Sequence, residues 1–539
     1  MDKTIIIGGK AGAGIKEAGR MLAGVLANLG YHVFGYVDYP SLIRGGHNFV
    51  TLRFSERPVN SVNKKADIIV ATDGRSIKAH EEDAKGDTVW LINEKEEKEG
   101  AIRVPFKEVA PGFFKSSSVL GAVLKLLGIP LEEGLPFILS LPQREKNEQI
   151  YREVYNSLDS VFEVKKVGER KGEIMTGNEN IALGAVDGGL DFYIAYPMTP
   201  ASPVLHYLAK KKSEFGIKVV HPENEIGAIN MAVGVAYAGK RSMVGTSGGG
   251  FALMTETLSL IGMSETPMVI YEAQRAGPST GVPTYTAQAD LLFVTFAGHG
   301  DFPRVVVAPG TPEEAYYLTR DSLNIAWRYQ IPVLILGDKH LGESYFLADI
   351  KRERVVEEPK LWRGNGEYRR YEITEDGISP LAFPGQEGVV VKGTSYEHDE
   401  RGITVEDAKL VKRMQDKRLR KGETLREYIL FREYAVVVGG DKSSRKVIVT
   451  WGSTWGTALD VAKELGYKVV RPLFLEPFPA DRVMEEIGSA ELVISLECSA
   501  SGQFERLLNM HGIRSHRNIK KYDGRPFFRD ELIEMLGEV

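Results

Sequence analysis

Three polar residues stand out in the sequence because each follows or opens an apolar run and could do chemistry there. Thr199 lies between two prolines in AYPMTPASPV, shortly after a strand-like run. Glu225 opens EIGAINMAVGVAYAG, a segment that is apolar on nearly every side of a helix. A carboxyl desolvated there could exchange a proton with a bound cofactor. Arg275 follows MVIYEAQ, and its guanidinium could hold a carboxylate with two hydrogen bonds.

Each of these residues also has a purely structural interpretation. Glu225 and its neighbour Glu223 could cap the helix and complement its dipole, and Arg275 could close a salt bridge. The loop after Arg275 carries Ser279, Thr280 and Thr284, and it could be a surface loop without function. Because ligands of open α/β sheets bind at the carboxyl ends of parallel strands, we expect the three segments to meet at one crevice.

The N-terminal segment IIIGGKAGAGIKEAG is a glycine-rich turn between a strand and a helix, with Asp38 at the end of the next strand. It fails the dinucleotide fingerprint, because Glu17 stands where the third glycine is required, and it is not a P-loop. Amides at the helix start could still bind a phosphate-bearing group, or the turn could hold no ligand. Arg44 in SLIRGGHN could contact an anion or simply belong to a turn.

The histidines and the cysteine do not form a recognisable metal site. His206, His221 and His299 lack metal-ligand spacing, so we expect them in the core or on the surface. Cys498 is the only cysteine, and it cannot form an internal disulfide or a four-cysteine zinc or iron-sulfur site. Any redox centre must therefore be bound elsewhere.

Length and composition predict a multidomain globular protein. The chain has 539 residues, a hydrophobic fraction of 43%, a charged fraction of 26% and a net charge of -5. These values argue against a nucleic-acid-binding surface. The sequence has no apolar run of membrane-spanning length, and its start resembles a folded strand rather than a cleavable signal. We therefore expect a cytoplasmic protein without a membrane or nucleic-acid partner.

The elements that must position these residues fall into three blocks, in which β-branched runs alternate with amphipathic helices. This pattern predicts three α/β domains with parallel sheets, at about residues 1–165, 178–345 and 431–539. Residues 164–178 are predicted as a linker. The charge-rich residues 346–430 are predicted to form a connecting arm with one helix on its surface.

Two helix ends carry clear local signals. Gly30 is predicted to stop the first helix. In the second block, Thr311, Pro312 and Glu314 are predicted to form a capping box with proline at the first helical position.

Five motifs, in order, carry a resemblance to a known family: YPMTPASP, HPENEIGAINMAVGVAYAG, TSGGGFALM, QRAGPSTGVPT and EHDERG. Together they closely resemble the alpha subunit of 2-oxoacid:ferredoxin oxidoreductases, which depend on thiamine diphosphate. The resemblance covers nearly the whole chain, and residues 1–165 look like the family's gamma domain fused in front of alpha. It implies a pyrimidine-type thiamine-diphosphate-binding domain at 178–345 and a transketolase C-terminal-like domain at 431–539.

The resemblance implies that a 2-oxoacid, coenzyme A and oxidised ferredoxin become acyl-CoA, carbon dioxide and reduced ferredoxin. In the family, the alpha subunit contacts the aminopyrimidine of thiamine diphosphate, whereas a beta subunit holds the diphosphate, Mg²⁺ and a [4Fe-4S] cluster. This chain lacks the family's GDG motif followed by asparagine, and it lacks the cysteines for a cluster. We therefore expect an active site shared with a beta subunit, with coenzyme A near the first block.

The family's residue roles carry over to four positions. Glu225 matches the glutamate that hydrogen-bonds the pyrimidine nitrogen and favours the imino tautomer of the cofactor. Thr199 matches a hydroxyl that hydrogen-bonds the substrate, and Arg275 matches the residue that binds its carboxylate. Tyr285 stands where the family commonly has a basic residue, which leans the expected preference toward pyruvate and other monocarboxylic oxoacids over 2-oxoglutarate.

Two other functions stay open at this point. A self-sufficient thiamine enzyme of transketolase type would share the three-block architecture, but it needs the missing diphosphate motif. A non-catalytic scaffold would use the first block to carry an acyl-CoA or a nucleotide. A nicotinamide-dependent dehydrogenase is disfavoured by the failed fingerprint.

Overall fold

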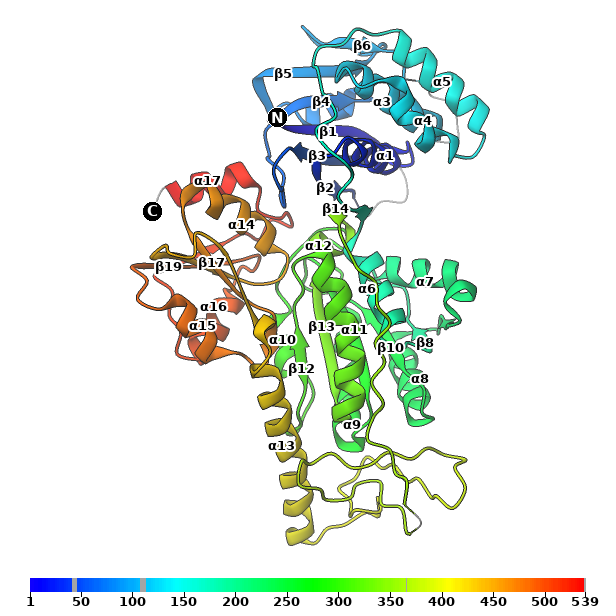
Figure 1. Ribbon diagram of the computed structural model, residues 1–539, viewed down its shortest axis with the longest axis vertical. Coiled ribbons are helices and arrows are strands. Elements are labelled where there is room, and N and C mark those ends of the chain that lie inside the picture. The colour runs from blue at the N-terminus through cyan, green and yellow to red at the C-terminus, as the bar shows by residue number, and fades with distance from the viewer. Residues whose placement is uncertain (41–45, 107–112, 365, 538–539) are drawn as a thin grey trace.

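The computed structural model describes residues 1–539 except 41–45, 107–112, 365 and 538–539. Its described strands form three sheets, of eight, seven and five strands. Figure 1 shows the first sheet at the top, the second below it and the third beside the second, with a long helix and an irregular arm at the bottom. The three units thus contact one another around the centre of the molecule.

The first sheet lies at the N-terminal end of the chain and is covered by helices. In sheet order its strands are β6 (Ile102–Val104), β5 (Ala84–Asn93), β4 (Ala66–Ala71), β1 (Asp2–Lys10), β3 (His47–Ser55), β2 (His32–Asp38), β14 (Tyr345–Ala348) and β7 (Glu173–Met175). Its helices are α1 (Ile15–Asn28), α2 (Gly74–Ala79), α3 (Phe113–Leu126), α4 (Leu131–Leu139) and α5 (Arg144–Asn156). The stop at Gly30 is confirmed, because this residue has a φ of 89° just after α1.

The prediction of a wholly parallel first sheet is wrong. Strand β3 inserts between β1 and β2 and runs antiparallel to both, whereas β1, β4, β5 and β6 are parallel. The sequence reading passed over β3 because HNFVTLRFS mixes polar and apolar residues. Its Arg53 is nevertheless buried, because Asp2 and Asp460 accept hydrogen bonds from its guanidinium.

The predicted linker at 164–178 is more structured than expected. It contains β7, which pairs with β14, and β14 in turn pairs with β2 of the first sheet. Thr176 then caps the next helix through a complete capping box with Glu179. Since β14 follows the second block in the chain, the sheets exchange strands across the expected domain bounds. The bounds themselves stay a prediction.

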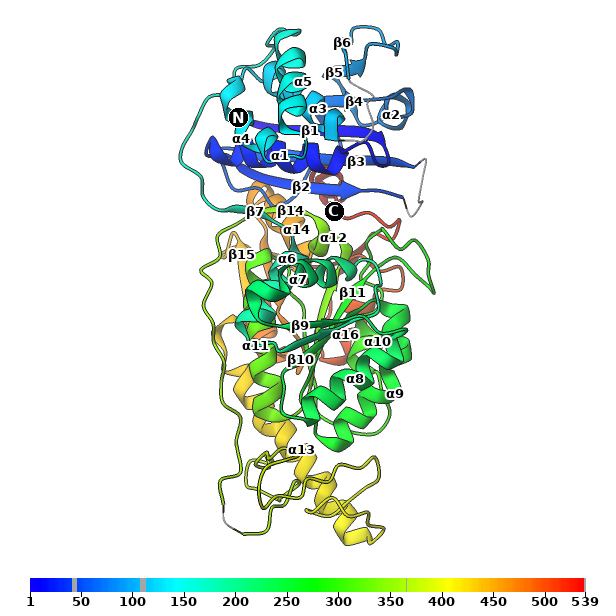
Figure 2. The ribbon, with the colours of Figure 1, turned by 90° about the vertical axis from the view of Figure 1, so that its right-hand side faces the viewer.

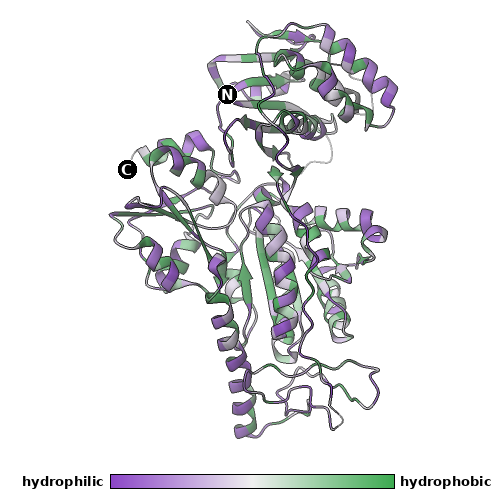
Figure 3. Cartoon of the chain, viewed as in Figure 1, coloured by the Kyte–Doolittle hydropathy of each residue, from purple (hydrophilic) through white to green (hydrophobic). Residues whose placement is uncertain are grey.

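The second sheet is parallel in all strands but one, as expected from its runs of apolar residues. In sheet order its strands are β18 (Phe474–Glu476), β12 (Val305–Val307), β13 (Pro332–Asp338), β11 (Met268–Gln274), β10 (Ser242–Thr246), β8 (Phe192–Ile194) and β9 (Lys218–Val220). Only β18 is antiparallel. The central strands are buried on both faces and coloured as hydrophobic in Figure 3, which explains their continuous apolar sequence.

Helices cover both faces of the second sheet. They are α6 (Gly177–Asp187), α7 (Ser202–Phe215), α8 (Glu225–Tyr237), α9 (Gly248–Ser264), α10 (Leu291–Phe296), α11 (Pro312–Tyr329) and α12 (Lys339–Glu343). The apolar residues of α6, α7 and α11 pack on one face, and those of α8, α9 and α10 pack on the other. Figure 2 shows α8, α9 and α10 lying side by side.

The capping box predicted at the start of α11 forms only in part. The Thr311 hydroxyl accepts a hydrogen bond from the Glu314 amide at 3.2 Å, and Pro312 is the first helical residue. The Glu314 carboxylate, however, accepts from the Gly310 amide and from Arg471 of the third unit. The reciprocal half of the box is therefore replaced by a link between two units.

The arm between β14 and α13 (Ala408–Leu430) contains the expected helix, but this helix is not simply a surface element. Lys417 and Lys421 of α13 are buried, and their ammonium groups contact the buried Glu265 carboxylate at 2.6 Å and 2.5 Å. This ion-pair cluster fixes α13 to the C-terminal end of α9.

The third sheet and its helices complete the C-terminal part. In sheet order its strands are β15 (Val436–Gly440), β17 (Lys468–Pro472), β16 (Lys446–Thr450), β19 (Leu492–Glu497) and β20 (Arg517–Lys520). The helices are the short 3-10 helix η1 (Glu433–Ala435), α14 (Thr454–Leu465), α15 (Ala480–Ile487), α16 (Gln503–Met510) and α17 (Arg529–Gly537). The α/β class predicted for all three blocks is confirmed. None of the described helices is both long and apolar enough to cross a membrane.

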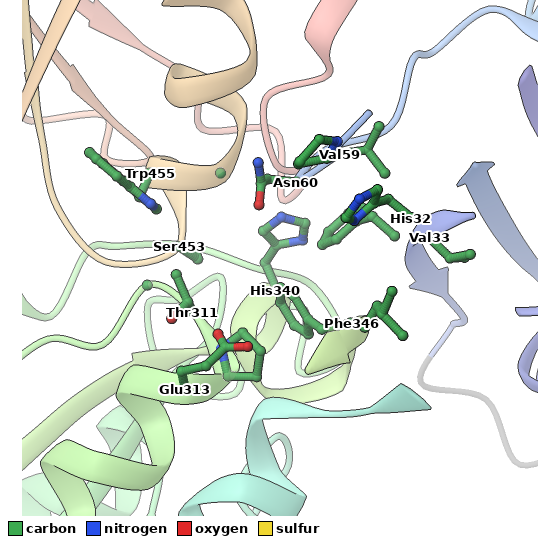
Figure 4. Close-up of a pocket in the computed structure, with 16 residues that line it drawn as sticks. His32, Val33, Val59, Asn60, Thr311, Glu313, His340, Phe346, Ser453 and Trp455 are labelled. Carbon is green, nitrogen blue, oxygen red and sulfur yellow. The ribbon is translucent and has the colours of Figure 1, made fainter. Parts of the chain in front are cut away.

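A cavity of about 200 Å³ lies where the three units meet (Figure 4). Asn60 of the first unit, His340 of the second and Trp455 of the third are among its lining residues. Burial lowers the pKa of His340 to about 3, so this side chain is neutral at physiological pH. Neither Thr199, Glu225 nor Arg275 lines this cavity.

Candidate functional site

Thr199 lies on the short segment between β8 and α7, at the carboxyl end of a central strand. The peptide bond between Thr199 and Pro200 is cis. The Thr199 carbonyl accepts a hydrogen bond from Nη1 of Arg275 at 2.8 Å. Arg275 itself follows the last residue of β11. Two of the three predicted residues are therefore in direct contact.

Glu225 is the first residue of α8, and its side chain is buried. Its exposed fraction is 5%, whereas Glu223 is exposed. The helix is capped by Asn224, whose side-chain oxygen accepts a hydrogen bond from the Gly227 amide at 2.7 Å. Since the cap is supplied by Asn224, the buried Glu225 carboxylate is not needed as a cap. Capping, the structural interpretation of Glu225, thus falls to another residue.

Gly250 keeps the space that Glu225 occupies. A Cβ atom added to Gly250 would lie 2.8 Å from Cγ of Glu225, 3.0 Å from its Oε1 and 2.1 Å from Oγ1 of Thr246. The first turn of α9 is therefore packed directly against the Glu225 side chain. This close approach explains why the GGG sequence opens α9.

Arg275 carries the positive charge of the site in a half-buried position. Burial lowers the pKa of its guanidinium, while the carboxyl groups of Glu272, Asp290 and Glu225 act in the opposite direction. The electrostatic coupling to Glu225 means that both side chains face a common region. Its Nε is buried and has no hydrogen-bond partner among the described residues.

The predicted convergence of the three segments is therefore what the structure has. Strands β9, β8, β10 and β11 are consecutive neighbours and run parallel. Their carboxyl ends consequently lie at one edge, and Thr199, Glu225 and Arg275 follow β8, β9 and β11 there. This edge carries a hydroxyl, a buried carboxyl and a guanidinium.

The other residues singled out by sequence are placed differently. Ser279 and Thr280 are exposed, whereas Thr284 is buried and its hydroxyl has no hydrogen-bond partner among the described residues. His221 packs its ring against that of Tyr196 at 6.0 Å. In the described part of the chain, no group of three or more histidine, cysteine or acidic side chains is placed to hold a metal ion. Arg44 lies outside the described residues.

Tyr285 lies under a guanidinium that sequence reasoning did not connect with it. The Arg525 guanidinium carbon is 3.9 Å from the centre of the Tyr285 ring, and its Nε contacts the buried Asp38 carboxylate at 3.1 Å. The Tyr285 carbonyl accepts a hydrogen bond from the Ala276 amide at 3.1 Å, directly after Arg275. A basic group is thus present beside Tyr285, although it comes from the third unit.

Two acidic residues near Arg275 were missed by sequence reasoning. Glu272 is fully buried in β11, and Asp290 directly precedes α10. Burial raises the pKa of Asp290 to about 6, although Arg275 acts to lower it. The available signal was an acidic residue inside MVIYEAQ, since charged residues are rare in strands buried on both faces.

Comparison with known proteins places this chain in a family. Residues 183–417 match the family model described as pyruvate flavodoxin/ferredoxin oxidoreductase, thiamine diP-bdg. Residues 4–156 match the model described as pyruvate ferredoxin/flavodoxin oxidoreductase. The central unit, with the three candidate residues, falls within the thiamine-diphosphate-binding match.

Curated relatives match over almost their whole length. The 2-oxoacid:ferredoxin oxidoreductase subunit alpha of a Sulfolobus species is 33% identical over 99% of this chain and 96% of the relative. The 2-oxoglutarate synthase subunit KorA of Archaeoglobus fulgidus is 32% identical over 61% of this chain and 88% of the relative.

A solved structure agrees with these relatives. The 2-oxoglutarate:ferredoxin oxidoreductase of Magnetococcus marinus, solved with 2-oxoglutarate, coenzyme A and succinyl-CoA bound, superposes with a TM-score of 0.90 and 30% identity. The match covers 100% of this chain and 99% of that chain. The resemblance inferred from the motifs is therefore confirmed, and this chain belongs to the family of 2-oxoacid:ferredoxin oxidoreductase alpha subunits.

Proposed function

We propose that this alpha subunit forms half of a shared active site in which a 2-oxoacid, coenzyme A and oxidised ferredoxin become acyl-CoA, carbon dioxide and reduced ferredoxin. The observation that carries the proposal is the convergence of Thr199, Glu225 and Arg275 at the carboxyl edge of the second sheet. Residues 1–165 are proposed as a gamma-like domain, 178–345 as the pyrimidine-binding domain, 346–430 as the arm and 431–539 as the C-terminal domain.

The residues present fit thiamine diphosphate. A carboxyl with 5% exposure at the start of an apolar helix is suited to hold a proton at a ring nitrogen, and Gly250 leaves it the room to do so. When bound, the cofactor supplies the carbon nucleophile for the keto carbon and takes up the electrons released on decarboxylation. Glu225 would hold its pyrimidine ring.

Each side chain then has one task toward the substrate or the cofactor. Glu225 exchanges a proton with the pyrimidine nitrogen, and it does not touch the substrate. Arg275 binds the carboxylate of the 2-oxoacid, because its guanidinium keeps free donors beside the one that bonds Thr199. The Thr199 hydroxyl donates a hydrogen bond to the substrate and fixes its orientation.

A surface beside Glu225 supports the docking of a beta subunit. Helices α8, α9 and α10 expose five large apolar side chains by between 38% and 54%, namely Ile226, Met231, Leu253, Phe293 and Phe296. Phe293 packs on Phe251 at 5.3 Å, which joins the faces of α9 and α10. Because apolar side chains gathered on adjacent helices mark interaction sites, we propose that the beta subunit covers this surface and brings the diphosphate site, Mg²⁺ and a [4Fe-4S] cluster.

Coenzyme A and ferredoxin are the remaining proposed partners. The Magnetococcus relative was solved with coenzyme A bound, and the Sulfolobus relative is named for ferredoxin. The reaction is proposed to take place in the cytoplasm.

The preferred oxoacid is not decided by Tyr285 alone. The sequence leaned toward monocarboxylic oxoacids because Tyr285 is uncharged, but Arg525 places a cation over its ring. This cation could pair with a second carboxylate, so the premise of that preference is lost.

The test is viologen reduction by this chain, with and without a co-expressed beta subunit, in the presence of coenzyme A and pyruvate, 2-oxobutyrate or 2-oxoglutarate. We expect turnover only with both subunits. Glu225→Gln should lower kcat by about 100-fold or more, because the amide cannot take up a proton. Glu223→Gln is the matched control, since this neighbouring carboxylate is exposed and should be dispensable.

Two results would contradict the proposal. Full turnover by Glu225→Gln in the reconstituted enzyme would remove the assigned role of this residue. Turnover by the isolated chain would show that the active site is not shared.

A further inference from the structure

Glu272 is a carboxyl group that the proposed reaction does not use and that lies behind the site. Its exposed fraction is 0%, and neither carboxyl oxygen has a hydrogen-bond partner among the described residues. A buried polar group without a partner is costly, and an ionised one is far more costly. Its presence in the middle of a central strand therefore requires an explanation.

The register places Glu272 on the side of the sheet that carries the site. Glu272 pairs with Thr246 of β10 and with Leu336 of β13. Side chains of paired residues point to the same face, and Leu336 belongs to the core shared with α8, α9 and α10. Thr246 in turn lies against the first turn of α9, next to the position of Glu225.

The charged groups around Glu272 come from every element packed near it. Asp290 precedes α10, Asp338 ends β13 and Arg275 follows the same strand, and all three act on Glu272 electrostatically. Tyr271 on the same strand is coupled to it as well. Burial raises the pKa of Glu272 well above its usual value, and the two aspartates add to this while Arg275 acts against it.

Arg275 shows the other side of the same arrangement. Its Nε is buried without a hydrogen-bond partner, and an ionised Glu272 would be the nearby acceptor able to neutralise the guanidinium. A neutral Glu272 leaves that charge available. We propose, on the basis of the proposed function, that Glu272 is a positioning residue that stays protonated and thereby keeps Arg275 free to bind the carboxylate of the 2-oxoacid.

The first test is the pH dependence of KM for the 2-oxoacid in the reconstituted enzyme, between about pH 6 and about pH 9. In the wild type, KM should rise toward the alkaline end, because an ionised Glu272 competes with the substrate for Arg275. In Glu272→Gln, which imitates the protonated form, KM should stay flat and lie within about twofold of the wild-type value at neutral pH. Glu256→Gln, on the exposed side of α9, should follow the wild type.

The second test needs no turnover. Because the folded-state pKa of Glu272 is raised, the folded chain holds a proton that the unfolded chain has released, so its contribution to stability falls as pH rises above about 4.5. Glu272→Gln should therefore melt about 2 °C or more above the wild type near about pH 8, with the gap closing in acid. The full chain alone suffices for this measurement.

The outcomes separate the two proposals. A Glu272→Gln enzyme whose KM is more than about tenfold raised at neutral pH would show that the negative charge is needed, and it would overturn the inference. A melting temperature equal to or below that of the wild type at alkaline pH would overturn it too. Absence of turnover in every variant would count against the proposed function, while the melting comparison would still judge Glu272.

Discussion

At the scale of single residues, Gly250 decides how much room the Glu225 carboxyl has. An added methyl group would lie 2.8 Å from Cγ of Glu225 and 2.1 Å from Oγ1 of Thr246. Gly250→Ala should therefore displace the Glu225 side chain and lower kcat of the reconstituted enzyme by about tenfold or more. Gly249→Ala is the control, because a Cβ atom there meets nothing within 4 Å.

An equal kcat for both alanine variants would mean that Glu225 tolerates displacement, and its assigned role in proton exchange would lose support. A loss of fold would be visible as a lowered melting temperature of the Gly250 variant. The comparison should therefore include thermal unfolding of both chains.

The site was predictable from sequence only where a residue departs from its local pattern. Glu225 could be found because it opens a helix that is otherwise apolar, and Arg275 because it follows a strand and precedes a proline-rich loop. Arg525 could not be found, since it lies 240 residues from Tyr285 in the chain and meets it only in the folded protein. Glu272 was passed over because one charge does not disturb the overall apolar character of its strand.

At the scale of elements, α13 depends on a buried cluster of charges. Glu265 ends the turn after α9 with a φ of 50°, and its carboxylate contacts both Lys417 and Lys421. Glu265→Gln would leave two buried ammonium groups without a counter-charge. We expect a loss of about 3 kcal/mol of unfolding free energy, measured by urea denaturation, whereas Glu256→Gln should be neutral.

The same cluster predicts a pH dependence of stability. Burial alone would raise the pKa of Glu265, but Lys417 and Lys421 outweigh it and hold the pKa well below the usual 4.5. The stabilisation is therefore present above pH 4.5 and is lost as pH falls toward the lower folded-state value. Acid should destabilise the wild type more than Glu265→Gln, and equal acid sensitivity would contradict this role of the cluster.

Elements buried on both faces were the ones that sequence reasoning located. All six parallel strands of the second sheet were predicted, because each reads as a run of apolar residues between turns. Strands β3, β7, β15 and β20 were not predicted. They lie at edges or carry polar residues that tertiary partners satisfy, and these partners are distant in the sequence.

At the scale of the whole molecule, one contact joins all three units near the site. Arg525 of the third unit stacks on Tyr285 of the second and pairs with Asp38 of the first. Arg525→Gln should raise KM for 2-oxoglutarate by about tenfold and change KM for pyruvate by less than about twofold, since only the former carries a second carboxylate. Arg514→Gln, an exposed arginine in the same unit, is the control.

An equal rise of both KM values would mean that Arg525 supports the loop after Arg275 without reading the distal end of the substrate. That outcome would return the choice of oxoacid to groups outside this contact.

The return of β14 to the first sheet bears on whether this protein could ever be cut in two. β14 pairs with β2, and β7 pairs with β14, so the first unit borrows its last two strands from chain that flanks the second. A gene split near residue 165 would produce a fragment whose β2 has open backbone groups along one side. Such a fragment would tend to aggregate unless it met its other half during synthesis, which favours one continuous reading frame.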